Sequence, residues 1–419
     1  MDRKKRYKHL LDLLNQYNSG EKGITRVAYT NEEQACTHAL MRLCKDAKMS
    51  VRLDAAGNMI ARREGKNPDL PPVVVGSHID TVYQGGKYDG LVGVTAGLEI
   101  IRRLNEEGIL TEHPIELISF ACEESSRFGV STVGSKAMAG KINKDKYRKL
   151  KDRDGISMEK AFSLCALDFT SIDQASRDRE TFEAFFELHI EQGPVLEQEM
   201  KQIGIVTGIA APARFIINLL GKASHSGTTP MNMRKDAVLG AAEIALALET
   251  AAIQEQDYGT VATVGFMRVE PGAMNVVPGE VEMKVDIRSA STESRQRVLD
   301  CLFSTISSVE QKRMLQIEAK EISLEEPVLL SDKVIDSLSV ICEEKGFSYR
   351  LLQSGAGHDA MNMIGIGQVG LVFIPSVDGL SHHPNEHTEL EDILTGIDLL
   401  ETAVRRYAKE TSACLPVGG

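Results

Sequence analysis

Short apolar runs alternate with amphipathic stretches along the first half of the chain. Residues 73–76, 114–122 and 185–189 are mostly apolar runs that end beside polar residues, and they predict buried strands. Residues 91–104 predict an amphipathic helix between the first two strands, and the charge-rich residues 141–182 predict short peripheral helices. Repeated strand–helix units of this kind are typical of a parallel or mixed sheet that is covered by helices.

The pattern changes after residue 211. Residues 281–287 alternate apolar and charged side chains, which is the period of a strand with one solvated face. Further strands are predicted at 214–220, 260–269 and 315–321, and helices at 233–250 and 293–313. The resulting order, strand–helix–strand–strand–helix–strand, is that of a ferredoxin-like α+β domain.

The first pattern resumes after residue 326. Residues 332–345 predict a helix, 370–374 a strand and 389–409 a closing amphipathic helix. We therefore expect an α/β catalytic domain at 1–211 and 327–419, with a mixed sheet and helices on both faces. The ferredoxin-like domain would be an insertion at 212–326.

Composition narrows the class of protein. The 419 residues carry a net charge of −12, which counts against a nucleic-acid partner because phosphate binding needs a basic face. No uninterrupted apolar run approaches the roughly 18 residues of a membrane span, and residues 1–15 predict an amphipathic helix instead of a signal peptide. The seven cysteines are scattered and form no Cys-x-x-Cys motif, so we expect free thiols and a cytoplasmic protein.

Histidines and carboxylates gather where the predicted strands end. The chain has only ten histidines, and one lies in Gly76-Ser77-His78-Ile79-Asp80, directly after the first buried strand. Glu123-Glu124 follow the second strand, His189 ends the third, and His382-His383 come after the last. Open α/β folds bind ligands at this edge of the sheet. His9, His38 and His113 have no motif around them, and we expect them at the surface.

These clusters predict a site for two divalent metal ions. The candidate ligands are His78, Asp89, Glu124, His189 and His382, with Asp89 as the bridge. Asp80 is placed to orient His78 from outside the ligand set. Two neighbouring cations lower the pKa of a water molecule and polarise a carbonyl, and Glu123 could then accept the proton of that water. Ligands of this kind suit Mn²⁺, Zn²⁺, Co²⁺ and Ni²⁺ nearly alike.

The same motifs resemble those of a known family. Gly-Ser-His-x-Asp, Asp-Gly, Glu-Glu, His-Ile-Glu-Gln-Gly-Pro and Ser-His-x-Pro-x-Glu, in this order, are similar to motifs of the dinuclear amidohydrolases related to aminoacylases and carboxypeptidases. The chain resembles most the hydantoinase/carbamoylase branch, with N-carbamoyl-L-amino-acid hydrolases, allantoate amidohydrolases and β-ureidopropionases. The resemblance spans about residues 25–401. His189 is the discriminating position, because peptidase and deacylase relatives usually have a carboxylate there.

The resemblance implies a fold and a set of roles. It implies an aminopeptidase-like catalytic domain with an inserted lid and dimerisation domain, and therefore a homodimer. His78 and Glu124 would be terminal ligands of different metals, and Glu123 would be the general base and acid. His383 stands beside His382, and the choice between these two as ligand stays open.

Substrate-binding roles also follow from the resemblance. His225 would stabilise the oxyanion from the partner subunit, and Arg288 would hold the substrate carboxylate through its planar guanidinium. The other substrate-binding candidates are Gln192, Asn275, Gly357 and His358. His358 has an alternative role, a structural hydrogen bond to Asp359.

We expect hydrolysis of the carbamoyl C–N bond of an N-carbamoyl-L-amino acid, which gives the amino acid, ammonia and carbon dioxide. Allantoate is the alternative substrate, because it also carries a carboxylate beside a ureido group. β-Ureidopropionate, a dipeptide or an acylated amino acid is less favoured. A binding protein without activity is disfavoured, because Glu123 and every candidate ligand are present.

Overall fold

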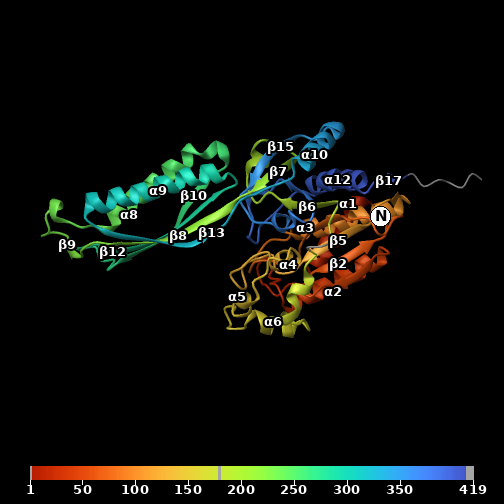
Figure 1. The fold of residues 1–419 in the computed structure, drawn as a ribbon, viewed down its shortest axis with the longest axis horizontal. Helices are drawn as coiled ribbons and strands as arrows, with labels where there is room; N and C mark the ends of the chain where they lie inside the picture. Colours follow the sequence, from red (N-terminus) through yellow and green to blue (C-terminus); the bar gives the residue numbers. More distant parts are fainter. Residues whose placement is uncertain (1, 178–180, 412–419) are drawn as a thin grey trace, which may run out of the picture. The chain divides into compact units, whose positions relative to one another are not determined.

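The computed structural model describes residues 2–177 and 181–411, and the chain divides into two compact units (Figure 1). The first unit comprises Met1–Thr207, Leu330–Leu352 and Gly357–Gly419. The second comprises Gly208–Leu329 and Gln353–Ala356. The second unit is a little wider than the insertion predicted at 212–326.

A mixed sheet forms the centre of the first unit, as predicted. Its strands are, in spatial order, β1 (Ser50–Leu53), β2 (Met59–Arg63), β5 (Ile115–Phe120), β3 (Val73–His78), β6 (Ala184–Ile190), β16 (Gln368–Ile374) and β7 (Ile203–Ile209). β15 (Tyr349–Ser354) pairs with β7. The four strands β5, β3, β6 and β16 are parallel to one another. β3 and β5 are buried along their whole length, which is why their sequences are continuous apolar runs.

Helices cover both faces of this sheet. α3 (Leu91–Glu106), α10 (Asp332–Lys345) and α12 (Leu390–Tyr407) pack on one face, and α1 (Arg3–Leu14) contacts α3 and α12. α11 (Ala360–Met363) lies on the other face, where it contacts β6, β16 and α4 (Val133–Met138). α2 (Asn31–Asp46) packs against β1 and β2.

Close packing of α3 fixes the position of the loop that precedes it. An ideal Cβ added to Gly93 would lie 2.5 Å from the backbone oxygen of Leu188 in β6, so only glycine allows this approach. The helix therefore begins directly above the sheet edge at which β3 and β6 end.

Short elements complete the first unit. They are β4 (Leu110–Thr111), which pairs with β17 (Glu410–Thr411), α5 (Lys144–Arg148), α6 (Met158–Leu164), η1 (Phe169–Ala175), α7 (Val195–Gln198) and η4 (Val377–Gly379). The short helices predicted within 141–182 are confirmed, and Phe162, Phe169 and Ile172 from these elements share a buried apolar cluster.

The second unit has an antiparallel four-stranded sheet in the order β10 (Val261–Glu270), β12 (Glu280–Ser289), β8 (Ala211–Leu220) and β13 (Gln316–Leu324). α8 (Ala237–Gln254) and α9 (Thr292–Arg313) pack on the sheet and share a buried core with it. The order of strands and helices along the chain is the predicted one. The remaining elements are β9 (Ser224–His225), β11 (Val276–Val277), β14 (Val328–Leu329), η2 (Met231–Met233) and η3 (Gln256–Tyr258).

The start of α8 and its apolar composition both bear on how the helix packs. It begins at Ala237 instead of residue 233, because Asp236 caps it by accepting the backbone N–H groups of Val238 and Leu239. α8 is also the one helix in the described residues that is long and apolar enough to cross a membrane, and 39% of it is buried. It packs against α9 and three strands of the sheet.

Candidate metal centre

Neighbouring parallel strands end at one edge of the main sheet and bring the predicted ligands there. His78 is the last residue of β3, and His189 lies one residue before the end of β6. Glu123 and Glu124 follow β5 after a short gap. His382 comes after β16, the parallel neighbour of β6. The four clusters that the sequence places at strand ends therefore meet at the same edge.

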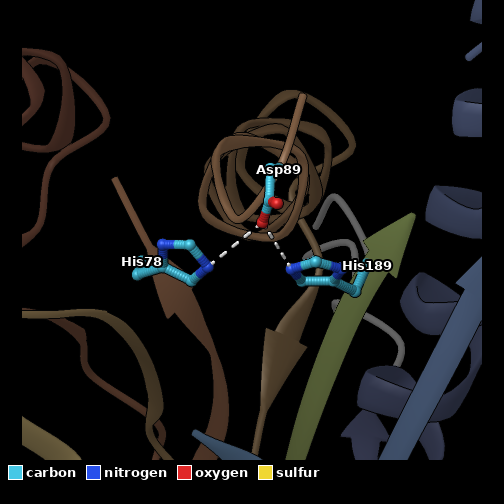
Figure 2. A group of neighbouring side chains, drawn as sticks. All are labelled: His78, Asp89 and His189. Carbon is cyan, nitrogen blue, oxygen red and sulfur yellow. Dashed lines mark ion pairs between the residues drawn. The ribbon is translucent and has the colours of Figure 1, made fainter. Parts of the chain in front are cut away.

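Asp89 lies at the centre of this group. Its Oδ1 is 3.1 Å from Nε2 of His189 and 3.5 Å from Nε2 of His78 (Figure 2). Its Oδ2 is 3.3 Å from Nε2 of His382, and that nitrogen is 3.2 Å from Oε1 of Glu124. The two oxygens of one carboxylate thus face two different sets of donor atoms.

The donors form two candidate ligand groups that share Asp89. The first is His78, Asp89 and His189, and the second is Asp89, Glu124 and His382; within each group the ligand atoms lie within 4.8 Å of one another. In the part of the chain that the structure describes, Asp89 and Glu124 form ion pairs with histidines and with no lysine or arginine. Imidazole and carboxylate donors around buried, uncompensated negative charge fit a pair of divalent cations.

Backbone carbonyls orient the imidazole rings. Nδ1 of His78 lies 2.9 Å from the backbone oxygen of Asp80, and Nδ1 of His189 lies 2.9 Å from that of Ile190. A carbonyl oxygen only accepts hydrogen bonds, so we assign the proton of each ring to Nδ1. Nε2 of each ring then presents its lone pair toward Asp89, the orientation that a metal ligand needs.

Asp80 connects two of the ligand-bearing loops. It orients His78 through its backbone oxygen, whereas its carboxylate accepts the backbone N–H groups of Glu123 and Glu124 at 3.2 and 3.0 Å. Burial raises the pKa of Asp80 to about 6. The sequence predicts the first of these roles and not the second.

Glu123 has the properties of an acid–base group. It is buried, and its Oε2 lies 3.7 Å from Nε2 of His78. Burial, together with the neighbouring carboxylate of Glu124, raises the pKa of Glu123 well above its usual range. A carboxyl group beside the ligand sets with a raised pKa can both accept a proton and return it.

The geometry favours His382 over His383 as a ligand. Nε2 of His382 faces the carboxylates of Asp89 and Glu124, and His382 belongs to the second ligand group. Both imidazoles are exposed, but Nδ1 of His383 accepts the backbone N–H of Asn385 at 3.1 Å, and His383 belongs to neither ligand group among the described residues.

Two residues of the centre carry no assignment from the sequence. Oε1 of Glu386 accepts the backbone N–H groups of Tyr88 and Asp89 at 2.9 and 3.1 Å. The hydroxyl of Ser381 donates to Oδ2 of Asp89 at 3.0 Å. Both residues belong to the Ser-His-x-Pro-x-Glu motif. The motif therefore marks their positions in the sequence, although the sequence analysis gives a role only to its histidine.

The first unit also holds three of the predicted substrate-binding residues. Nε2 of Gln192 donates to Oδ2 of Asp89 at 2.9 Å, while its buried Oε1 has no hydrogen-bond partner within the described chain. His358 is buried, and its ring stacks edge-on against that of His189 with 4.6 Å between centroids. Gly357 precedes it, and a Cβ added there would meet only Sδ of Met361, at 3.7 Å.

The remaining substrate-binding candidates belong to the second unit. β9 and β11 pair His225 with Val276, and the backbone oxygen of Asn275 accepts the N–H of Ser226 at 3.0 Å, so His225 and Asn275 are neighbours. Both side chains are exposed. The roles of His225 and Asn275 at the metal centre of the first unit remain predictions.

Arg288 also belongs to the second unit. Its Nη2 pairs with Oδ2 of Asp286 at 3.1 Å, and its Nη1 donates to the backbone oxygen of Gly355 at 2.9 Å. Its role as the carboxylate-binding residue remains a prediction.

The expectation for the histidines outside the motifs is correct in two cases. His9 and His38 are exposed. The expectation for His113 is wrong: it is buried, and its Nδ1 lies 2.9 Å from the backbone oxygen of Pro71. A backbone oxygen that pairs with Nδ1 of a buried imidazole is a tertiary feature without a local sequence signal.

Known proteins resemble this chain over nearly its whole length. The profile of peptidase family M20/M25/M40 matches residues 74–406. An uncharacterized hydrolase of Haemophilus influenzae is 45% identical over 96% of this chain and 98% of its own length. An N-carbamoyl-L-amino-acid amidohydrolase of Pseudomonas sp. is 38% identical over 92% of this chain and 94% of its own. A ureidoglycolate hydrolase of Arabidopsis thaliana is 35% identical over 92% and 82%.

Solved structures agree with the sequence comparisons. An amidase of the hydantoinase/carbamoylase family from Burkholderia multivorans has a TM-score of 0.90 and 34% identity, and it covers 99% of this chain and 98% of its own. The chain belongs to peptidase family M20/M25/M40. It is a hydrolase of amide C–N bonds, and the family resemblance predicted from its motifs is confirmed.

Proposed function

We propose that the protein hydrolyses the carbamoyl C–N bond of N-carbamoyl-L-amino acids. The observation that carries this proposal is the buried carboxylate of Asp89, shared by two ligand groups, with Glu123 beside them. The relative from Pseudomonas sp. whose name states this activity supports the choice of substrate. The products are the amino acid, ammonia and carbon dioxide, which balance the substrate and one water molecule.

Glu123 performs the proton transfers in this proposal. The cations that the two ligand groups fit, Mn²⁺ or Zn²⁺ foremost and Co²⁺ or Ni²⁺ as alternatives, lower the pKa of a water molecule and polarise the carbamoyl oxygen. Glu123 accepts a proton from the attacking water and delivers it to the leaving nitrogen. Its raised pKa suits both steps, because the proton is taken up readily and the protonated form is stable in the buried site.

The other predicted residues bind and orient the substrate. Gln192 can use its unpaired Oε1 to accept an N–H of the carbamoyl group, which would be held next to Asp89. Arg288 would bind the carboxylate, and His225 would donate to the oxyanion. Asn275, Gly357 and His358 would complete the substrate contacts.

Allantoate is the alternative substrate. It carries a carboxylate and a ureido group, so the same residues could bind it. Because one relative is named ureidoglycolate hydrolase, ureidoglycolate should be tested as a third substrate.

Ammonia release separates these substrates. Metal-reconstituted protein is given N-carbamoyl-L-amino acids, allantoate and ureidoglycolate in parallel, with Glu123→Gln as the blank. We expect kcat/KM to be highest for a carbamoyl amino acid and at least about 10³-fold lower in the Glu123→Gln variant. Faster turnover of allantoate or ureidoglycolate would support the same hydrolytic mechanism and show that the proposed substrate is wrong. Cleavage of peptides without any ureido turnover would contradict the proposal.

We also propose a homodimer that forms through the second unit. α8 supports this, because Leu239, Leu246 and Ile253 are exposed along a helix of high hydropathy. A cytoplasmic location is supported by the six cysteines within the described chain, all of which are free thiols; Cys414 lies outside the described residues.

A further inference from the structure

We propose that Arg26 is a positioning residue for the metal centre. Its guanidinium holds the segment His78–Thr81, which carries the ligand His78 and the connecting residue Asp80. The inference rests on the metal-dependent function proposed above, and it adds a residue of the N-terminal segment to the machinery.

Arg26 is attached to this segment by its side chain and its backbone. It is 1% exposed, and its Nε donates to the backbone oxygen of Ile79, the residue between His78 and Asp80, at 2.7 Å. The backbone N–H of Arg26 donates to Oγ1 of Thr81 at 2.9 Å, and the N–H of Thr81 donates to the oxygen of Arg26 at 3.0 Å. Three hydrogen bonds to Arg26 therefore hold the segment in place.

The other end of the guanidinium is anchored in the N-terminal helix region. Nη1 of Arg26 donates to the backbone oxygens of Leu14 and Tyr17, both at 3.2 Å. Leu14 is the last residue of α1, so its carbonyl has no partner within the helix. The side chain thus connects the segment that carries His78 to the end of α1.

A second arginine ties the same segment to the other ligand-bearing loop. Nη1 of Arg127, three residues after Glu124, donates to the backbone oxygens of Ala28 and Tyr29 at 2.6 and 2.7 Å. Asp80 joins the two loops directly through the N–H groups of Glu123 and Glu124. The N-terminal segment is therefore hydrogen-bonded to both of the loops that Asp80 connects.

The bonding of Arg26 is unusual for a buried charge. Buried guanidinium groups are normally paired, because removing an unpaired charge from water is costly. In the described part of the chain, Arg26 has no carboxylate within ion-pair distance, and its hydrogen bonds go to carbonyl oxygens. A stabilising role alone would be filled as well by apolar packing. Holding three backbone oxygens of two separate segments at once requires the fork of donors that only arginine has.

Arg26→Lys tests this role, because lysine keeps the charge and loses the fork. Arg63→Lys is the matched control: Arg63 is also a buried arginine of the first unit, and it bonds Asn105, Thr111 and the oxygen of Ile109, away from the predicted ligands. The readouts are Zn²⁺ affinity of the metal-free protein by chelator competition, the visible spectrum of the Co²⁺ form, and the thermal midpoint without metal. Outer contacts of metal ligands typically change affinity about 10- to 100-fold.

We expect the two variants to lose similar thermal stability, while only Arg26→Lys loses at least about 10-fold in Zn²⁺ affinity and changes the Co²⁺ spectrum. In Arg26→Lys, kcat should fall, whereas KM should stay within about twofold of the wild-type value, because the segment His78–Thr81 does not bind the substrate. Equal Zn²⁺ affinity and unchanged Co²⁺ spectra in both variants would show that Arg26 is only structural. Since metal affinity is measured without substrate, failure of the proposed substrate would leave this result interpretable.

Thr81 provides a milder variant in case Arg26→Lys does not fold. Thr81→Val removes the acceptor for the Arg26 N–H and keeps the side-chain shape, whereas Thr81→Ser keeps the hydroxyl. Weaker Zn²⁺ affinity in Thr81→Val that Thr81→Ser restores would support the inference. Wild-type affinity in Thr81→Val, measured together with folded metal-free protein, would overturn it.

Discussion

At the scale of single residues, Gly90 controls how His78 is placed. Its φ is +64°, in the left-handed region, and an ideal Cβ there would lie 2.4 Å from Nε2 of His78. We expect Gly90→Ala to push the ring away from Asp89 and to lower Zn²⁺ affinity and kcat at least about 10-fold. Chelator competition and steady-state kinetics measure the two effects.

Gly108 offers a matched control for this substitution. Its φ is +67°, and a Cβ added there would have no atom within 4 Å. Both alanine variants should lose about 1 kcal/mol of unfolding free energy from the left-handed backbone. If Gly108→Ala lost metal affinity as Gly90→Ala does, general destabilisation would be the cause and the clash with His78 would not.

Sequence motifs predict the ligands and miss the residues that hold them. His78, Asp89 and His189 could be found because glycine, carboxylate and imidazole at strand ends form a local pattern. Glu386 and Arg26 act by accepting or donating to backbone groups far away in the sequence, at Asp89 and Ile79. Such partners depend on tertiary contacts, and no spacing along the chain encodes them.

At the scale of secondary-structure elements, α2 carries a buried acid that makes stability depend on pH. Burial, assisted by Asp80, raises the pKa of Glu33 from 4.5 to about 7. Between these values the folded chain binds a proton that the unfolded chain does not, so stability falls as the pH rises through this range. A shift of this size corresponds to at most about 3 kcal/mol.

Glu33→Gln should remove this dependence. The amide oxygen can still accept the hydroxyl of Thr37, which Oε1 of Glu33 accepts at 3.1 Å. We expect the variant to melt at a higher temperature than the wild type at pH 8 and at nearly the same temperature at pH 5. The exposed Glu21→Gln variant is the control and should match the wild type at both values. Equal melting temperatures of Glu33→Gln and wild type at pH 8 would refute the assignment.

The sequence predicts well those elements in which the pattern of apolar and polar residues follows directly from burial of their faces. β3 is buried on both faces and reads as a continuous apolar run, while β12 alternates because one face is solvated. β2 was missed because it contains Arg62 and Arg63, whose polar partners come from other segments. β7 was missed because its two glycines break the apolar run. Tertiary pairing stabilises both strands.

At the scale of the whole molecule, the predicted residues are divided between two units. The ligand groups and Glu123 belong to the first unit, and His225, Asn275 and Arg288 belong to the second. The proposed substrate contacts therefore draw on residues of both units, and the proposal allows these to come from one chain or from two. Metal binding should depend only on the first unit, so His225→Ala is expected to bind Zn²⁺ as the wild type does.

Mixing two inactive variants distinguishes these cases. His225→Ala and Glu123→Gln each destroy every site of their own homodimer. If His225 acts on the partner subunit, a mixed dimer contains one site with both residues intact. Random pairing of equal amounts gives about half mixed dimers, each with one active site of two, so about a quarter of wild-type activity should return after subunit exchange.

The control for this experiment is the double variant, which carries both substitutions on one chain. Exchanged with wild-type protein, its mixed dimers should have no site with both residues intact if His225 acts across the dimer, so activity per wild-type subunit should fall by about half. If His225 acts within its own chain, the mixture of single variants stays inactive, and the double variant leaves activity per wild-type subunit unchanged. Activity is thus regained in the mixture of single variants and lost in the mixture with the double variant if His225 acts across the dimer, and neither change occurs if it acts within its own chain. Disagreement between the two mixtures would reveal an experimental error.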